Sequence, residues 1–173
     1  MSVFAAHDAA AATGHGNGVS VETRVGPGPG PGPGPGPGLS QTVLRYLPVP
    51  VVIRLSEGEP FERLVRLLAA GTRAGAPLGL STALKLPRPL RALLKERRVR
   101  VFVESDADWL ERAAKVGDGS SRIRMIGGDP RALAEAVGGS TDVAIHAGEV
   151  TRAGRIELLP FLAEQTVSST AAR

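Results

Sequence analysis

The sequence lacks cysteine altogether and has few aromatic side chains. Without cysteine the chain can form no disulfide, hold no metal through thiolates and use no cysteine nucleophile. Aromatic residues make up 3% of its 173 residues, and none stands within the basic stretch 85–100, where stacking on nucleic-acid bases would require one. These absences remove cysteine-dependent catalysis and weaken the case for nucleic-acid binding.

Histidines and long apolar runs are also scarce. His7 and His15 precede the predicted folded part, and His146 stands in an apolar run, where a packed or surface histidine is commoner than a general base. We therefore predict no catalytic, cofactor-binding or metal-binding residue. No apolar run approaches the ~20 residues that span a bilayer, and the N-terminus lacks a signal-peptide pattern. We expect a cytoplasmic protein without a membrane partner.

The chain divides at about residue 40. Residues 1–40 have almost no large apolar side chains, and residues 26–38 alternate glycine with proline. This composition predicts a disordered head and an extended linker. Residues 41–173 contain the apolar runs that can build one small domain.

Strand patterns alternate with helix patterns in the folded part. Strands are predicted at 49–55, 78–82, 99–103 and 123–126. Helices are predicted to begin at Pro60, Pro89, Ser105 and Asp129. This rhythm predicts an α/β fold with a Rossmann-like, doubly wound parallel sheet covered by helices on both faces.

The C-terminal part breaks this rhythm. The runs 143–150 and 155–159 flank a short loop that contains Gly154, a residue suited to a turn. The pattern predicts a β-hairpin flap at about 143–159, followed by a tail. Arms of this kind pair with a neighbour's sheet edge, so the flap could also join two copies of the chain.

The turns between strands and helices offer one candidate anion site. Gly127 and Gly128 precede a helix start, although the cap residues Asp129 and Pro130 favour a plain turn there. The turn after the first strand carries two glutamates and lacks the GxGxxG fingerprint of dinucleotide sites. An NAD- or nucleotide-binding α/β enzyme domain remains an alternative function.

One stretch of the chain is strongly basic, with Glu96 as its one acid. The basic residues between 85 and 100 are Lys85, Arg88, Arg91, Lys95, Arg97, Arg98 and Arg100. We interpret the stretch as a solvated helix face and keep a nucleic-acid binder as a third alternative.

Acidic residues gather at the helix start that follows Ser105. The helix dipole favours negative charge at such a start, so capping explains Asp106, Asp108 and Glu111. Trp109 falls in register with the apolar stripe and is interpreted as a core anchor.

Two segments resemble a known family. The run RIELLPFLAEQTVS at 155–168 is similar to the terminal motif of actinobacterial-type bifunctional proline utilisation flavoenzymes, which join proline dehydrogenase to L-glutamate γ-semialdehyde dehydrogenase. The run RYLPVPVVIRL at 45–55 is also similar, and the resemblance covers about 41–173. It departs at the end, where family members commonly show a histidine near Ala172.

The resemblance implies a stand-alone or detached copy of the family's accessory C-terminal domain. This domain has an aldehyde-dehydrogenase-like Rossmann fold and is not catalytic. It docks on the aldehyde dehydrogenase domain, in cis or in trans, and helps enclose the cavity through which the pathway intermediate passes. FAD and NAD belong to the parent enzyme, and neither is expected to bind to this chain, so any enzyme name would describe the parent.

The resemblance also implies which residues dock, divided between the flap and a terminal motif at about 158–173. The flap residues are Gly154, Arg155 and Glu157, and the motif residues are Pro160, Phe161, Glu164, Gln165 and Ser168.

Overall fold

The computed structural model describes residues 20–22, 40–115 and 121–170. The described residues fall into two compact units. Residues 48–162 form the first unit, which contains a parallel sheet and its helices. The second contains residues 20–22, 40–47 and 163–170 and forms a small antiparallel sheet.

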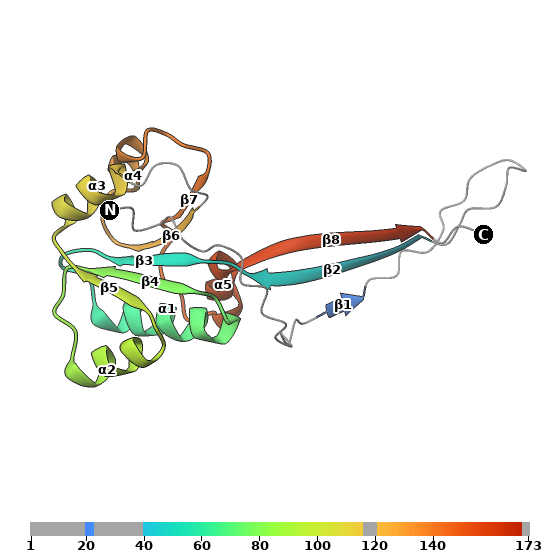
Figure 1. Ribbon diagram of the computed structural model, residues 1–173, viewed down its shortest axis with the longest axis horizontal. Coiled ribbons are helices and arrows are strands. Elements are labelled where there is room, and N and C mark those ends of the chain that lie inside the picture. Colours follow the sequence, from blue (N-terminus) through green and yellow to red (C-terminus); the bar gives the residue numbers. More distant parts are fainter. Residues whose placement is uncertain (1–19, 23–39, 116–120, 171–173) are drawn as a thin grey trace, which may run out of the picture. The chain divides into compact units, whose positions relative to one another are not determined.

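The first unit is built around a five-stranded parallel sheet with the order β5-β4-β3-β6-β7 (Figure 1). Its strands are β3 (Val51–Leu55), β4 (Leu78–Thr82), β5 (Arg100–Val103), β6 (Ser121–Ile126) and β7 (Val143–His146). From β3 the chain winds outward to β5, then crosses back to β6 on the other side of β3. This is the strand order of a Rossmann-like sheet, so the predicted fold class is confirmed.

Helices cover both faces of this sheet. They are α1 (Phe61–Ala74), α2 (Arg88–Glu96), α3 (Asp106–Ala114) and α4 (Pro130–Ala136). Figure 1 shows α1 and α2 on one face and α3 and α4 on the other. Alternation along β3 explains both layers, because Ile53 packs into the cluster on the α1 side while Val52 packs against the cluster around Trp109.

The ends of the helices follow the predicted caps. The Ser105 hydroxyl accepts a hydrogen bond from the Asp108 amide at 3.1 Å, the first bond of the predicted capping box, and donates to the Asp108 carboxylate at 2.7 Å. Asp129 caps α4 by accepting from the Arg131 amide at 2.8 Å. At the end of α1, Gly75 has a φ of 71°, a conformation that glycine adopts readily.

The predicted hairpin at 143–159 is wrong. Its predicted first strand, Val143–His146, pairs in parallel with β6 as the last strand of the sheet. Its predicted second strand is instead the helix α5 (Gly154–Leu158), which is followed by a 3-10 turn, η1 (Leu159–Phe161). The helix forms because it buries Glu157 beside Arg124, 3.1 Å away. In an extended strand, alternate residues would point to opposite faces, and the inward face that the helix presents would be lost.

The antiparallel sheet uses other parts of the chain. Its order is β1-β2-β8, formed by β1 (Ser20–Glu22), β2 (Ser40–Pro48) and β8 (Leu162–Thr170). β1 pairs with β2 in the antiparallel sense, and Figure 1 shows β2 and β8 running in opposite directions. β1 falls within the predicted disordered head. The Gly-Pro linker at 26–38 lies outside the described residues, and the domain boundary at residue 40 stays a prediction.

Candidate functional site

The crevice where Rossmann-like sheets bind ligands is filled by a glutamate. Ligands bind there outside the carboxyl ends of the strands, at the point where the strand order reverses, and here that point lies between β3 and β6. Gly127 follows β6 with a φ of 70°, and a Cβ at this position would collide with the carboxylate of Glu59. Arg63 donates a hydrogen bond to that carboxylate at 2.8 Å. The protein's own ion pair therefore occupies the crevice.

The predicted anion site at Gly127 and Gly128 has little room for an anion. Gly128 has a φ of 74°, and a Cβ there would lie 2.6 Å from the hydroxyl oxygen of Ser56. The neighbouring cap, Asp129, adds a second carboxylate to this turn. A pyrophosphate would meet negative charge at this turn, so the geometry favours a plain turn and counts against a nucleotide-binding enzyme.

A network of charged side chains lies at the carboxyl ends of β3, β4 and β5. Arg54 is fully buried in β3 and donates to the Asp106 carboxylate at 2.5 Å and to the Ser81 hydroxyl at 2.6 Å. Ser81 in turn donates to Glu104 at 2.6 Å. Asp106 therefore does more than favour the helix start, because it also neutralises a buried guanidinium.

Arg112 completes the network from α3. Its guanidinium donates to Glu104 at 3.0 and 2.5 Å, and it lies 4.1 Å from the centre of the Phe102 ring and 4.9 Å from that of Trp109. Cations stacked on aromatic faces are stabilised by the ring quadrupole. Trp109 is 3% exposed and belongs to the core, as predicted.

The electrostatics of the network favour ionised carboxylates. Burial by itself raises the pKa of Glu104, but hydrogen bonds from Arg112 and Ser81 and the charge of Arg112 outweigh it and lower the pKa. Burial also acts to raise the pKa of Asp106, but the hydrogen bond from Arg54, the hydrogen bond from the Glu57 amide and the charge of Arg54 together outweigh it, so that pKa is lowered too. Carboxylates held ionised by arginines are suited to holding strands and helix together rather than to donating protons.

His146 lies half-buried in β7 among positive charges. Burial, together with the charges of Arg122 and Arg124, lowers its pKa. Its Nε2 atom is buried and has no hydrogen-bond partner among the described residues. A neutral, packed histidine fits this environment.

Glu157, a predicted docking residue, lies inside the first unit. It is 4% exposed and forms an ion pair with Arg124 at 3.1 Å. Its other oxygen accepts from the Thr151 amide at 2.5 Å. Arg124 also donates to the Gly148 carbonyl at 2.7 Å, so the pair fastens α5 and the loop before it to the sheet. The contacts of Glu157 are internal to this chain.

The other predicted docking residues divide between buried and exposed positions. Pro160 and Phe161 are buried, with Phe161 at 0% exposure in the core. Arg155 in α5 and Glu164 and Gln165 in β8 are exposed. Gly154, also exposed, begins α5, and Ser168 lies in β8 with its side chain outside the described residues.

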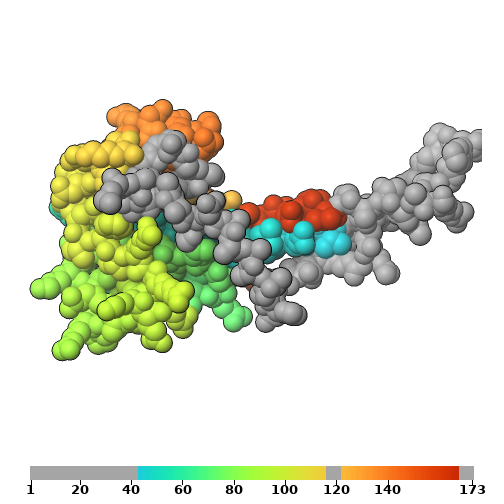
Figure 2. Space-filling model, viewed as in Figure 1, coloured from blue at the N-terminus to red at the C-terminus, as the bar shows by residue number. Residues whose placement is uncertain are grey.

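β8 exposes both of its faces. Consecutive residues of a strand point to opposite faces, and residues 164–167 are all exposed. Arg45 of β2 donates to Gln165 at 2.7 Å across the pair, and Leu47 and Val167 are 42% and 39% exposed. β8 is also an edge strand of its sheet. In Figure 2 β2 (cyan) and β8 (red) lie side by side at the surface. We call this pair, β2 and β8, the arm.

The chain was compared with known families, curated proteins and solved structures. No known family model matches the chain, and no curated protein matches its sequence. Among solved structures, the chain is similar to Proline Utilization A from Corynebacterium freiburgense, with 26% identity, 78% of this chain covered and a TM-score of 0.45. The chain spans 11% of the length of that protein. No described helix is both long enough and apolar enough to cross a membrane.

Proposed function

We propose that this chain is a non-catalytic interaction domain of proline catabolism. It docks through the arm on the aldehyde dehydrogenase domain of a proline utilisation enzyme and helps enclose the cavity in which the intermediate passes between active sites. The observation that carries the proposal is the exposure of β8 on both faces at residues 164–167. A small antiparallel sheet is marginally stable in water unless one face is covered, and an edge strand offers unpaired backbone groups to a partner.

The resemblance to proline utilisation flavoenzymes supports the choice of partner. The similar run at 155–168 spans α5, η1 and the first part of β8. Its first half supplies Glu157 and Phe161 to the protein's own interior, and its second half supplies the exposed strand. The run therefore has two roles, because it fastens the end of the first unit and then presents a surface.

The arrangement of charged groups supports a role without catalysis. Glu104 and Asp106 are ionised partners of arginines, and His146 is packed among cations. The sheet's ligand crevice holds Glu59. A docking domain requires none of these groups to react, whereas a nucleotide-dependent enzyme would need the crevice for its ligand.

The test is co-elution with a proline utilisation enzyme from which the equivalent C-terminal domain has been removed. We expect the 173-residue chain to co-elute in size-exclusion chromatography. A chain ending at Ala163 keeps the buried Phe161 and removes the exposed part of β8, and we expect it to fold but not to co-elute. Unchanged co-elution of this shortened chain would contradict docking through the arm.

Point variants sharpen the same test. Leu47→Glu and Val167→Glu place charge on exposed apolar positions of the arm, and we expect each to weaken the complex. Val65→Glu is the matched control because Val65 is 46% exposed on α1, outside the arm. A loss of binding in the control as large as in the arm variants would show that the complex does not depend on the arm.

A further inference from the structure

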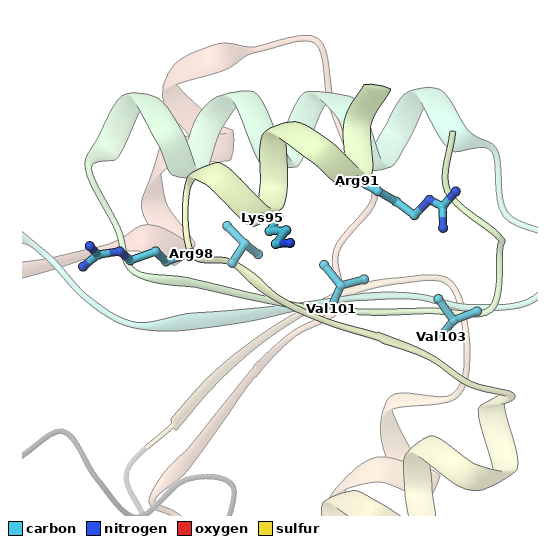
Figure 3. A pocket seen from close by; sticks show the side chains of 6 residues that line it. Arg91, Lys95, Arg98, Val101 and Val103 are labelled. Carbon is cyan, nitrogen blue, oxygen red and sulfur yellow. The ribbon is translucent and has the colours of Figure 1, made fainter. Parts of the chain in front are cut away.

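A shallow groove lies beside α2 at the outer edge of the parallel sheet. It has a volume of about 390 Å³ and is lined by Arg91, Lys95, Arg98, Val99, Val101 and Val103. Figure 3 shows Arg91 and Arg98 toward opposite ends of the groove, with Lys95 and Val101 between them. We call it the α2 groove. Its cations surround an apolar floor, and it lies outside the arm.

Val103 is the exposed valine of the groove, whereas Val99 and Val101 are partly buried against the core. Val101 and Val103 lie on the same face of β5 because they are two residues apart. Phe102, between them, faces the other way and packs under Arg112. Val103 is 58% exposed at the edge of the described sheet, where the unpaired backbone of an edge strand is open to a partner strand.

The cations of the groove lack acidic partners. Among the residues that the structure describes, Arg91, Lys95 and Arg98 take part in none of the ion pairs. The one acid of the surrounding stretch 85–100 is Glu96. Three unpaired cations around an apolar floor are complementary to a segment that carries apolar and acidic side chains.

The backbone at Arg98 points independently to a role for its side chain. Arg98 has a φ of 56°, the one positive φ at a non-glycine residue in the described part of the chain. It stands just after α2, where the Val99 amide donates to the Leu94 carbonyl at 2.9 Å and the Arg98 amide to the Lys95 carbonyl at 3.0 Å. Helices that end in this way favour glycine at that position. An arginine in this conformation costs backbone strain, which motivates the hypothesis that its guanidinium has a function.

We propose that the α2 groove binds an extended segment of a partner protein, apolar at its centre and acidic at both ends, as an added strand beside β5. In the described part of the chain, β5 pairs with β4 on one side and ends the sheet on the other. The added strand lays its apolar side chains on Val101 and Val103. Its terminal carboxylates then reach Arg91 and Arg98. This site is separate from the arm, so it does not depend on the proposed docking.

The test uses a defined probe and the whole 173-residue chain. The probe is a fluorescein-labelled peptide with three central valines between two pairs of glutamates, and its anisotropy is followed as the chain is added. We expect saturable binding that weakens as salt is raised, because the contacts at the ends are ionic. A peptide with lysines in place of the glutamates, and one with N-methyl groups on alternate amides, should both fail to bind.

Variants separate binding from folding. Arg98→Gly removes the guanidinium and the backbone strain at this position, so the melting temperature of the variant should be no lower than that of the parent. Its affinity for the peptide should fall about three-fold, the effect of losing one exposed ion pair. Val103→Glu should abolish binding by adding a negative charge to the floor. Val65→Glu, on α1, should leave the affinity unchanged.

Four results would overturn the proposal. The first is the absence of saturable peptide binding by a folded chain, and the second is equal affinity for the lysine peptide. The third is tight binding of a single-stranded oligonucleotide without binding of the peptide, which would assign the cations to nucleic acid. The fourth is a dimer that Val103→Glu dissociates, which would assign the groove to a second copy of the chain.

Discussion

The buried ion pair between Glu157 and Arg124 gives the sharpest test of the fold. Their side chains are 5% and 4% exposed, and the two charges lie 3.1 Å apart. Removing one member of such a pair leaves an uncompensated buried charge and typically costs about 3–5 kcal/mol. Glu157→Gln keeps an oxygen for the Thr151 amide but removes the negative charge. We expect it to lower the free energy of unfolding by about 3 kcal/mol, the lower end of that range.

The assay is urea unfolding followed by tryptophan fluorescence. Trp109 is the one tryptophan of the chain and is 3% exposed, so its emission reports the loss of the core. The control is Glu149→Gln, because the Glu149 carboxylate is 80% exposed and lies 3.8 Å from Arg63. It should change stability by less than about 0.5 kcal/mol.

A double variant isolates the pair itself. Arg124→Met combined with Glu157→Leu replaces both charges with apolar groups but also leaves the Gly148 carbonyl and the Thr151 amide without these partners. We therefore expect it to recover only part of the stability lost by Glu157→Gln. A free energy of unfolding for Glu157→Gln within about 0.5 kcal/mol of the parent's, a change typical of surface positions, would show that the buried pair contributes little. If that variant also lost partner binding, Glu157 would be a docking residue, as the resemblance implies.

Three further predictions test other parts of the structure. Gly71→Ala adds a Cβ within 2.9 Å of two side chains and should cost about 1–3 kcal/mol, whereas Gly154→Ala, with open space around it, should be neutral in the same urea assay. The pKa of His146 is lowered in the folded chain, so the unfolded chain binds a proton at this side chain more readily. The free energy of unfolding should therefore decrease as the pH is lowered below 6.5, the ordinary pKa of histidine. His146→Gln should flatten that slope in unfolding curves measured from about pH 7 to about pH 5. Arg98→Gly should raise the free energy of unfolding by roughly 0.5–1 kcal/mol. The left-handed conformation costs arginine about 1–2 kcal/mol, and the greater entropy of glycine in the unfolded chain offsets about 0.5–1 kcal/mol of that gain. A lower melting temperature would contradict this.

The parallel sheet could be predicted from the sequence because its signals are local. The strand predicted at 78–82 has the same bounds in the structure. Ser105 and Asp108 define a helix start by their spacing alone. Such signals depend on residues a few positions apart, which a sequence displays directly.

The C-terminal part could not be predicted from local pattern. Residues 155–159 read as a short strand, but short apolar runs fit helix and strand equally well. The choice of helix follows from Arg124, which stands 33 positions before Glu157. The arm also depends on residues far apart in the sequence, because its two long strands come from opposite ends of the folded part.

Two arginines within the predicted strands indicate buried charges, and the sequence analysis did not use them. Arg54 interrupts the β-branched run VVIRL, and Arg124 interrupts RIRMI. An arginine inside a strand that is buried on both faces must find a carboxylate or carbonyl partner. The partner of Arg54, Asp106, lies 52 positions away, so the need for a partner was visible although its identity was not.

The most direct measurement is the coupled turnover of proline to glutamate by a proline utilisation enzyme without its C-terminal domain. The 173-residue chain is added in excess, and the lag before glutamate appears is compared with that for the chain ending at Ala163. The proposed function predicts that the whole chain shortens the lag and that the shortened chain does not. An unchanged lag with the whole chain, together with no co-elution, would contradict a docking domain that acts in trans.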